Sequence, residues 1–384
     1  MTEHSRAHFE PRIAADARRP TDRSLPRRLV VRAPGRVNLI GEHTDHSGGL
    51  ALPFATDLAL RVVAERSPRP DPETPSRDAC IVVRSRATGE RVRVELPLAD
   101  EPFGPASTGR SPQLDQFLRA AVAELAARGI ELPSAQLEID GDLPPGVGLS
   151  SSAALCLGLL VALAALAGAS FPDRLDLARL ASRVEHRAGG APGGLLDQLA
   201  ILAGSPATAS LIDFATNQVE AVPLTLPGAR LAILPSGERR ALGASAYRTR
   251  VEECARAAQL LGVEHLAHAP LELVAELPEP LRSRARHVVE ETARVRDAAS
   301  ALRAGDVERL GELLDASHRS LRDLFEVSTP ALERTRAHAR DAGAIAARLL
   351  GGGFGGVVLA LFPATRPLPK EARAVQAADG LAIW

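Results

Sequence analysis

The sequence predicts a protein of two domains that mixes short strands with helices, and three observations lead to this prediction. The chain has 384 residues, 45% of them apolar, and at roughly 150 residues per domain this length favours two domains. Short segments with alternating β-branched residues are interspersed with longer amphipathic segments. The pattern starts again after Gly204, which places the predicted domain boundary near residue 205.

The first domain, residues 28–205, is expected to hold a mostly antiparallel sheet. Its first strand covers Arg28–Arg32, and Pro34-Gly35 is expected to break it. Further strands are predicted from β-branched alternation at Leu60–Glu65, Ala79–Arg84, Arg91–Leu96 and Ala135–Asp140. Helices are predicted at Leu114–Arg128, Ala153–Ala169 and Leu175–His186.

The second domain, residues 206–384, is expected to contain both strands and helices. Its predicted helices are Ala244–Leu261, Leu281–Ala304, Asp306–Ser317, Ala331–Ala342 and Glu371–Ala378. Its predicted strands are Ala209–Asp213, Arg230–Pro235 and Val357–Phe362, the last one directly after a glycine-rich loop at 351–356. Residues 1–27 are predicted to be a mobile lead-in, because they are rich in arginine and proline and lack an apolar segment.

The basic residues exclude several mechanisms. Of 46 basic residues, Lys370 is the single lysine, and it lies in a Pro-Leu-Pro-Lys-Glu-Ala segment. A Walker-A loop, a protein kinase and a pyridoxal enzyme each need a lysine in a defined context, which Lys370 does not have. Any cationic chemistry must therefore come from arginine, a metal ion or backbone N–H groups.

The net charge and the cysteine content limit the binding partners and the cellular compartment that are expected for the protein. The net charge of −1 and the small number of aromatic residues argue against nucleic acid as a partner. Three widely spaced cysteines without a C-x-x-C motif favour a reducing compartment, so a cytoplasmic protein is expected. The uncharged segment Ala153–Ala169 would span about 25 Å as a helix, short of the roughly 30 Å of a bilayer core, so a buried helix is predicted there and no membrane partner.

Two glycine-containing segments of the first domain concentrate polar residues. In the segment from Arg32 to Asp45, followed by His46-Ser-Gly-Gly, charged side chains flank a short Val-Asn-Leu-Ile strand, where they could hold a polyhydroxylated ligand. The segment from Leu143 to Ala153, Leu-Pro-Pro-Gly-Val-Gly-Leu-Ser-Ser-Ser-Ala, enters the apolar helix. Its glycines expose backbone N–H groups, its serines can cap the helix, and the helix N-terminus favours an anion. This pattern predicts a phosphate cradle without lysine.

Two later segments add further candidates. Glu185 and Asp197 bracket a glycine-rich loop, so one carboxylate could bind Mg²⁺ while the other accepts a proton from a hydroxyl. The glycines of 351–356 lack side chains and would permit close approach of a ligand or of another backbone segment.

In order and spacing, these four segments resemble those of the GHMP kinases. Gly35-Arg-Val-Asn-Leu-Ile-Gly-Glu-His-Thr-Asp45 closely matches the signature of the galactokinase branch, and the resemblance extends from Leu29 to Phe362. It implies a two-domain α+β fold with mixed or antiparallel sheets and an ATP cleft between the domains. It also implies ATP and Mg²⁺ as cofactors, a monomeric enzyme, and phosphorylation of the anomeric hydroxyl of α-D-galactose to galactose 1-phosphate.

Carried over position by position, the resemblance implies a complete set of site residues. Asp197 is implied as the catalytic aspartate near the sugar O1, and Arg36 as the transition-state stabiliser. The implied sugar contacts are Glu42, His43, Thr44 and Asp45, completed by Gly194 and Tyr247. The implied ATP phosphate loop consists of Gly146, Val147, Gly148, Leu149, Ser150, Ser151 and Ser152. The implied magnesium ligands are Ser152 and Glu185.

This set suits phosphoryl transfer, which depends mostly on positioning and charge stabilisation. Arg36 fits the cationic role because a guanidinium stays protonated and can face both a carboxylate and a phosphate. Asp197 could act as a true base or only orient the hydroxyl, and the sequence leaves both alternatives open.

Some positions depart from the pattern that the family usually shows. His46-Ser47 stands where Tyr-Asn is usual, and Leu349-Leu350 where Met-Thr is common. The departures bear on the sugar preference, and two alternatives to a galactose kinase stay open. One is a related sugar-1-kinase acting on N-acetylgalactosamine, galacturonate or arabinose. The other is a non-enzymatic galactose sensor, which the complete serine run Ser150–Ser152 and the presence of Asp197 disfavour.

Overall fold

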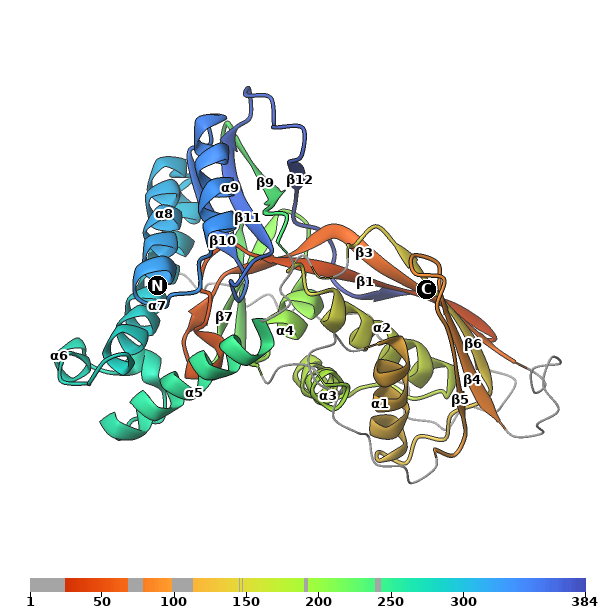
Figure 1. Cartoon of the computed structure of the whole chain (residues 1–384). Helices are drawn as coiled ribbons and strands as arrows, with labels where there is room; N and C mark the ends of the chain where they lie inside the picture. The colour runs from red at the N-terminus through yellow and green to blue at the C-terminus, as the bar shows by residue number, and fades with distance from the viewer. Residues whose placement is uncertain are drawn as a thin grey trace, which may run out of the picture.

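The computed structural model of the chain describes residues 25–67, 79–98, 113–144, 146, 148–189, 193–238 and 243–384. Figure 1 shows two lobes, one built on a long twisted sheet and the other dominated by helices that cover a smaller sheet. Most of the lead-in predicted for residues 1–27 lies outside the described residues.

The first lobe contains a sheet with the strand order β13-β1-β3-β6-β4-β5. Its strands are β1 (Arg28–Asn38), β3 (Pro53–Arg66), β4 (Cys80–Ser85), β5 (Arg91–Glu95), β6 (Ala135–Gly141) and β13 (Ala382–Ile383). All neighbouring strands are antiparallel except β4 and β6, which run parallel. The prediction of a mostly antiparallel sheet is therefore confirmed.

Helices pack against this sheet on one side. They are α1 (Leu114–Ala126), α2 (Ser151–Leu166), α3 (Arg174–Arg187) and α4 (Leu196–Ala203). Helix α2 contacts β1 and β3 as well as α1 and α3, and every residue from Cys156 to Ala164 is buried. An all-round apolar helix needs such surroundings, so the predicted buried central helix is confirmed. Within the described ranges, no helix is both long and apolar enough to cross a membrane.

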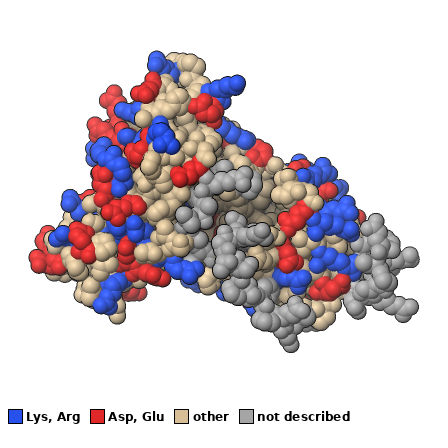
Figure 2. Space-filling view, in the orientation of Figure 1, with Lys and Arg blue, Asp and Glu red and all other residues tan. Residues whose placement is uncertain are grey.

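The second lobe contains an antiparallel sheet with the order β10-β11-β9-β12. Its strands are β9 (Ala229–Pro235), β10 (Ala346–Leu350), β11 (Val357–Pro363) and β12 (Arg373–Val375). Its α-helices are α5 (Gly243–Leu261), α6 (Leu271–Ala275), α7 (Leu281–Ala304), α8 (Val307–Asp323) and α9 (Pro330–Asp341). Figure 2 shows acidic and basic side chains lying beside one another over this lobe, as expected for solvated helix faces.

Parts of the chain on both sides of residue 205 share sheets. The short strand β2 (Leu50–Ala51) pairs with β7 (Thr208–Asp213), which pairs with β8 (Gln218–Pro223). The last strand, β13, returns to the first lobe and pairs with β1. The boundary near residue 205 stays a prediction, and these strands bind the two halves of the sequence together.

Two expectations about single elements are wrong. Pro34-Gly35 does not end the first strand, because β1 continues to Asn38 through a register irregularity between Pro34 and Arg36. A bulge can accommodate a proline, which has no N–H to donate. No helix forms at Glu371–Ala378; Arg373–Val375 is strand β12, paired with β9. There, edge pairing with a buried strand outweighs helix propensity.

Candidate active site

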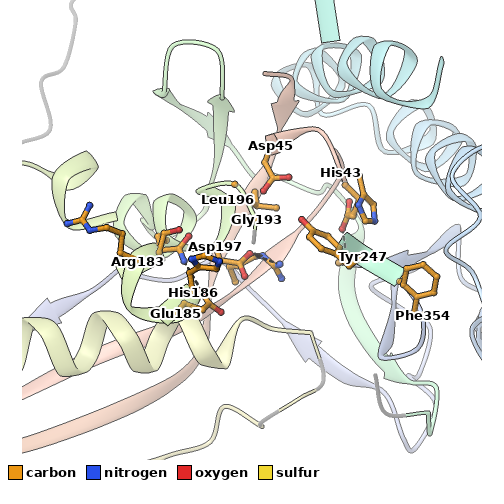
Figure 3. A pocket seen from close by; sticks show the side chains of 18 residues that line it. His43, Asp45, Arg183, Glu185, His186, Gly193, Leu196, Asp197, Tyr247 and Phe354 are labelled. Atoms are coloured by element: carbon orange, nitrogen blue, oxygen red, sulfur yellow. Dashed lines mark hydrogen bonds and ion pairs between the residues drawn. The ribbon is translucent and has the colours of Figure 1, made fainter. Parts of the chain in front are cut away.

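A cavity of about 470 Å³ lies where segments from both lobes meet. It is lined by β1 at Arg36, by the loop after β1, by α3 and α4, by Tyr247 of α5 and by the glycine-rich loop at 351–354. In Figure 3, Glu185 and Asp197 lie on one side of this space, and His43 and Tyr247 lie on the other. Segments that are far apart in the sequence thus converge on one site.

Arg36 joins Asp197 to the loop that precedes α2. Its Nε and Nη2 atoms lie 2.8 and 2.6 Å from Asp197 Oδ1, and its Nη1 donates to the Gly148 carbonyl at 2.8 Å. Its backbone N–H donates to the Leu149 carbonyl at 3.1 Å. The side chain is 7% exposed and that of Asp197 is 29% exposed. A fixed cation therefore lies between a carboxylate that solvent can reach and the predicted phosphate loop.

Asp197 lies in the first turn of α4, directly after Leu196. The partial positive charge of a helix N-terminus stabilises an acidic side chain at this position. Helix α4 was absent from the predicted elements, because its eight residues are mostly apolar and follow a glycine-rich loop without a helical repeat.

Of the four predicted sugar contacts in the loop after β1, three line the cavity and one does not. Glu42, His43 and Asp45 line the cavity. Thr44 does not; it is fully buried, and its hydroxyl lies 3.0 Å from the Gly41 carbonyl and 2.8 Å from the Leu50 carbonyl. Thr44 therefore holds the turn that presents its neighbours.

His43 is buried against aromatic rings in a strained backbone conformation. Its φ is 60°, a left-handed value that a non-glycine residue rarely adopts outside functional sites. Its ring centroid lies 4.4 Å from that of Phe325 and 5.3 Å from that of Tyr247. Burial lowers the pKa of His43 well below its usual value, so the ring is neutral.

Asp45, Gly194 and Tyr247 also line the cavity. A Cβ atom at Gly194 would lie 2.7 Å from Asp45 Cγ, so only glycine fits against this carboxylate. Figure 3 shows the Asp45 carboxylate and the Tyr247 hydroxyl on the cavity side of their elements. His46, at one of the departures from the family pattern, lies edge-on to Tyr247 with a centroid distance of 6.3 Å. The structure thus brings these predicted sugar contacts together.

The predicted phosphate loop reaches the N-terminus of α2. Ser150 precedes the helix with a left-handed φ of 59°, and Ser151 is the first helical residue. The Ser150 side chain makes no capping hydrogen bond, so the expected serine cap does not form there. Its Oγ is buried without a partner in the described part of the chain. A buried hydroxyl beside a helix N-terminus fits an anion, which would accept a hydrogen bond from it.

The loop is described at Gly146 and from Gly148 onward, and Val147 lies outside the described residues. None of its described residues lines the cavity itself. Arg36 spans the distance between loop and cavity through its bond to Gly148.

Ser152 and Glu185 are brought together as the magnesium prediction requires. Ser152 Oγ donates to Glu185 Oε1 at 2.5 Å, and Gln198 Nε2 donates to Glu185 Oε2 at 2.9 Å. Burial and the negative charge of Asp197 raise the pKa of Glu185 to about 7. The described residues hold no group of three His, Cys, Asp or Glu side chains suited to a metal. Protein magnesium sites usually combine one or two carboxylates with substrate phosphates, so this oxygen pair fits such an ion.

Sequence reasoning missed several residues that build the site. Arg348 is fully buried and bonded to Glu42. His287 and Glu291 of α7 hold the loop after β1: His287 Nε2 donates to the Glu42 carbonyl at 3.1 Å, and the Gly41 N–H donates to Glu291 at 3.1 Å. The signal for Arg348 was a single charge within the apolar run Ala346–Leu350.

Family models match the chain over three ranges. Residues 116–205 match the description "GHMP kinases N terminal domain", and residues 298–383 match "GHMP kinases C terminal". Residues 21–66 match "Galactokinase galactose-binding signature", the range that holds Arg36 and Glu42.

Relatives and solved structures agree with these matches. Galactokinase of Mycobacterium tuberculosis H37Rv is 40% identical over 341 residues, covering 87% of this chain and 89% of that protein. Galactokinase of Thermotoga maritima is 33% identical with the same coverage. The crystal structure of Lactococcus lactis galactokinase complexed with galactose superposes with a TM-score of 0.80 at 29% identity, covering 92% of this chain and 95% of that one. A mevalonate kinase structure, at 20% identity and a TM-score of 0.65, shares the fold.

The fold and the paired N- and C-terminal matches define a GHMP kinase, which confirms the α+β two-domain fold class. Within that class, the chain belongs to the galactokinase family and is a sugar kinase.

Proposed function

We propose that the enzyme transfers the γ-phosphoryl group of ATP to the anomeric hydroxyl of α-D-galactose, giving galactose 1-phosphate and ADP. The observation that carries the proposal is the contact of Arg36 with both Asp197 and the glycine-serine loop. One guanidinium thus touches the carboxylate proposed to face the sugar hydroxyl and the loop proposed to hold the ATP phosphates. This is the arrangement that an in-line transfer requires.

Asp197 faces the sugar hydroxyl in this proposal. Both bonds from Arg36 go to Oδ1, so Oδ2 is not bonded to Arg36 and can accept the hydroxyl proton. Asp197 then acts either as a base or as an orienting acceptor while Arg36 stabilises the developing negative charge.

The sugar binds among Glu42, His43, Asp45 and Tyr247, with the space beside Asp45 kept open by Gly194. Carboxylates accept hydrogen bonds from sugar hydroxyls, while His43 and Tyr247 add apolar ring surface. Thr44 supports this set through its bonds to Gly41 and Leu50, without a direct sugar contact.

The ATP phosphates bind at Gly146–Ser152, where backbone N–H groups, the α2 N-terminus and the Ser150 hydroxyl serve as donors. Ser152 and Glu185 hold Mg²⁺, which supplies charge neutralisation at the phosphates when bound. Two observations support this assignment: the hydrogen bond between Ser152 and Glu185, and the raised pKa of Glu185. A bound cation would offset the electrostatic repulsion between the carboxylates of Glu185 and Asp197.

The test is ADP release measured in a coupled assay with ATP, Mg²⁺ and a panel of sugars. Galactose is expected to give the highest kcat/KM, with N-acetylgalactosamine, galacturonate and arabinose well below it. A higher kcat/KM with one of those three would reassign the substrate. No turnover with any aldose, combined with galactose binding in calorimetry, would indicate the non-enzymatic sensor.

The proposed enzyme is cytoplasmic and monomeric. The three cysteines are all free and buried, which suits a reducing compartment. Light scattering coupled to size-exclusion chromatography tests the monomer, for which the mass of one chain is 40.4 kDa.

A further inference from the structure

A fully buried arginine of the second lobe reaches into the sugar-binding loop of the first. Arg348 lies in the middle of β10, where all five residues from Ala346 to Leu350 are buried. Its Nη1 donates to the carbonyls of Asn38 at 3.1 Å and Leu39 at 2.9 Å, at the end of β1. Its Nη2 donates to the carboxylate of Glu42. One guanidinium therefore fixes the end of β1 and the side chain of Glu42 together.

Glu42 is held at both carboxylate oxygens. Oε2 accepts from Arg348, and Oε1 accepts from the backbone N–H of Gly351 at 2.8 Å. The Glu42 carbonyl accepts from His287 at 3.1 Å, which fixes the backbone as well. Because each carboxylate oxygen can accept more than one hydrogen bond, Glu42 keeps acceptor capacity for the cavity that it lines.

The ionisation of Glu42 depends on this contact. Burial, together with the charge of Glu291, leaves the pKa of Glu42 above its usual value, and Arg348 and the Gly351 N–H limit that rise. Without the guanidinium, a carboxyl that is 2% exposed would be protonated or would turn toward another donor. A protonated carboxyl donates one hydrogen bond and loses part of its acceptor capacity.

Stability alone does not account for such a pair. Burying two charges costs several kcal/mol in lost hydration, and apolar side chains of similar volume often replace buried pairs without loss of stability. Within the pair, Glu42 lines the cavity and Arg348 does not, and their contact connects the two lobes at this site. This placement suits a role in binding.

We propose that Arg348 is a positioning residue that orients the Glu42 carboxylate, so that Glu42 accepts a hydrogen bond from one hydroxyl of the sugar. The inference rests on the proposed function, because it takes the sugar cavity as given. Arg348 itself does not line the cavity and makes no direct contact there.

The experiment compares Arg348→Met and Arg348→Lys with wild type. Galactose KM, ATP KM and kcat are measured, and galactose is then replaced by each of its monodeoxy analogues. The matched control is Arg284→Met. Arg284 is 3% exposed and binds Glu253 at 2.9 Å and Glu326 at 2.5 Å, but neither it nor these partners line the cavity. Circular dichroism and thermal unfolding check that each variant is folded.

We expect Arg348→Met to raise galactose KM about 10- to 100-fold, because this is the effect of losing one hydrogen bond to a charged group. The KM for ATP is expected to stay within about threefold of the wild-type value. In wild type, one deoxy analogue loses the bond to Glu42. In Arg348→Met, the ratio of the KM of that analogue to the KM of galactose falls to about threefold or less. The same ratio for each of the other analogues stays as in wild type. Arg284→Met lowers the melting temperature and leaves galactose KM unchanged.

Other results overturn the inference. If a folded Arg348→Met variant keeps the wild-type galactose KM, or if these KM ratios stay unchanged for all deoxy analogues, Arg348 does not position Glu42. If Arg348→Met does not fold, Arg348→Lys decides by the same two readouts, since lysine keeps the charge but cannot reach Glu42 and both carbonyls together. A wild-type chain without galactose-dependent ADP release overturns the proposed function as well, which separates the two failures.

Discussion

Arg36 and Asp197 form an ion pair in which Nε and Nη2 both lie within 2.8 Å of the same oxygen, Oδ1. The remaining nitrogen of the guanidinium, Nη1, donates to the Gly148 carbonyl. Arg36 is thus held from two sides in the chain without ligands. A preorganised cation of this kind stabilises charge that develops in a transition state, because it needs no reorganisation during the reaction.

Replacing Arg36 by alanine is expected to lower kcat by roughly 10²–10³, as for the loss of one electrostatic stabiliser. Steady-state rates with galactose and ATP check this. Arg32→Ala is the control, because Arg32 lies on the same strand and donates to the backbone carbonyls of Thr56, Asp57 and Asp379. Near-normal turnover of Arg36→Ala would remove Arg36 from the catalytic set.

Asp197→Asn keeps the shape of the side chain and removes its charge. The expected loss in kcat is about 10²–10⁴, typical for general base catalysis. Asp213→Asn is the control, because Asp213 ends β7 and accepts from the Ala215 N–H at 2.9 Å. Wild-type turnover of Asp197→Asn would exclude both the base and the orienting role.

Gly194→Ala places a Cβ atom 2.7 Å from Asp45 Cγ, so Asp45 must shift. Overpacking of this kind costs about 1–3 kcal/mol, and we expect galactose KM to rise roughly tenfold or more. Gly193→Ala is the matched comparison, since the nearest atom to its new Cβ is the Tyr247 hydroxyl at 3.6 Å, an ordinary contact. Equal effects of the two substitutions would contradict the specific fit at Gly194.

Glu185→Gln removes one of the two proposed magnesium ligands. The Mg²⁺ concentration for half-maximal activity is expected to rise about 10- to 100-fold, the range known for weakened metal sites. Glu138→Gln is the control, since Glu138 belongs to an exposed ion pair with Arg86. An unchanged Mg²⁺ requirement would place the ion elsewhere.

Several buried histidines make stability depend on pH, among them His43, His287 and His318. Burial lowers the pKa of His287 and of His318 to about 4. The unfolded chain binds a proton at each between pH 6.5 and 4 and the folded chain does not. The free energy of unfolding therefore falls as pH drops through that window, by about 1–3 kcal/mol for each histidine.

Urea unfolding at pH 7.5 and pH 5 measures this loss. His287→Gln cannot titrate and should flatten the pH dependence between these two values. A pH dependence as steep as that of wild type would assign the effect to other groups.

Sequence periodicity was sufficient to predict a helix or strand whose conformation is determined by its own residues. The ends of α7, Leu281–Ala304, match the prediction, and the apolar run after Ser150 forms the buried helix α2. Segments whose state depends on distant partners were misjudged. Helix α4 was missed, and β12 was expected to be a helix, because pairing with β9 decides its conformation.

The residue types at the site were readable from the sequence because glycine, serine and carboxylates stand close together within short segments. The resemblance to the GHMP kinases joins Arg36, Asp197, Glu185 and Ser152 into one set, and the structure brings them together. Which atoms meet was not readable. Arg36 bonds both Asp197 and Gly148, and Thr44 bonds the backbone of its own turn. These contacts depend on side-chain positions, which sequence spacing does not determine.

The sequence by itself determined the family, the two-lobed fold and the residue types that the chemistry requires, because each is encoded in local motifs. It also determined that arginine takes the place of lysine, since Lys370 is the single lysine of the chain. Only the tertiary structure decided that Arg348, more than 300 positions after Glu42, lies behind the sugar-binding loop. The physical reason is that a buried charge needs a partner, and packing of the two lobes, which no local pattern records, selects that partner.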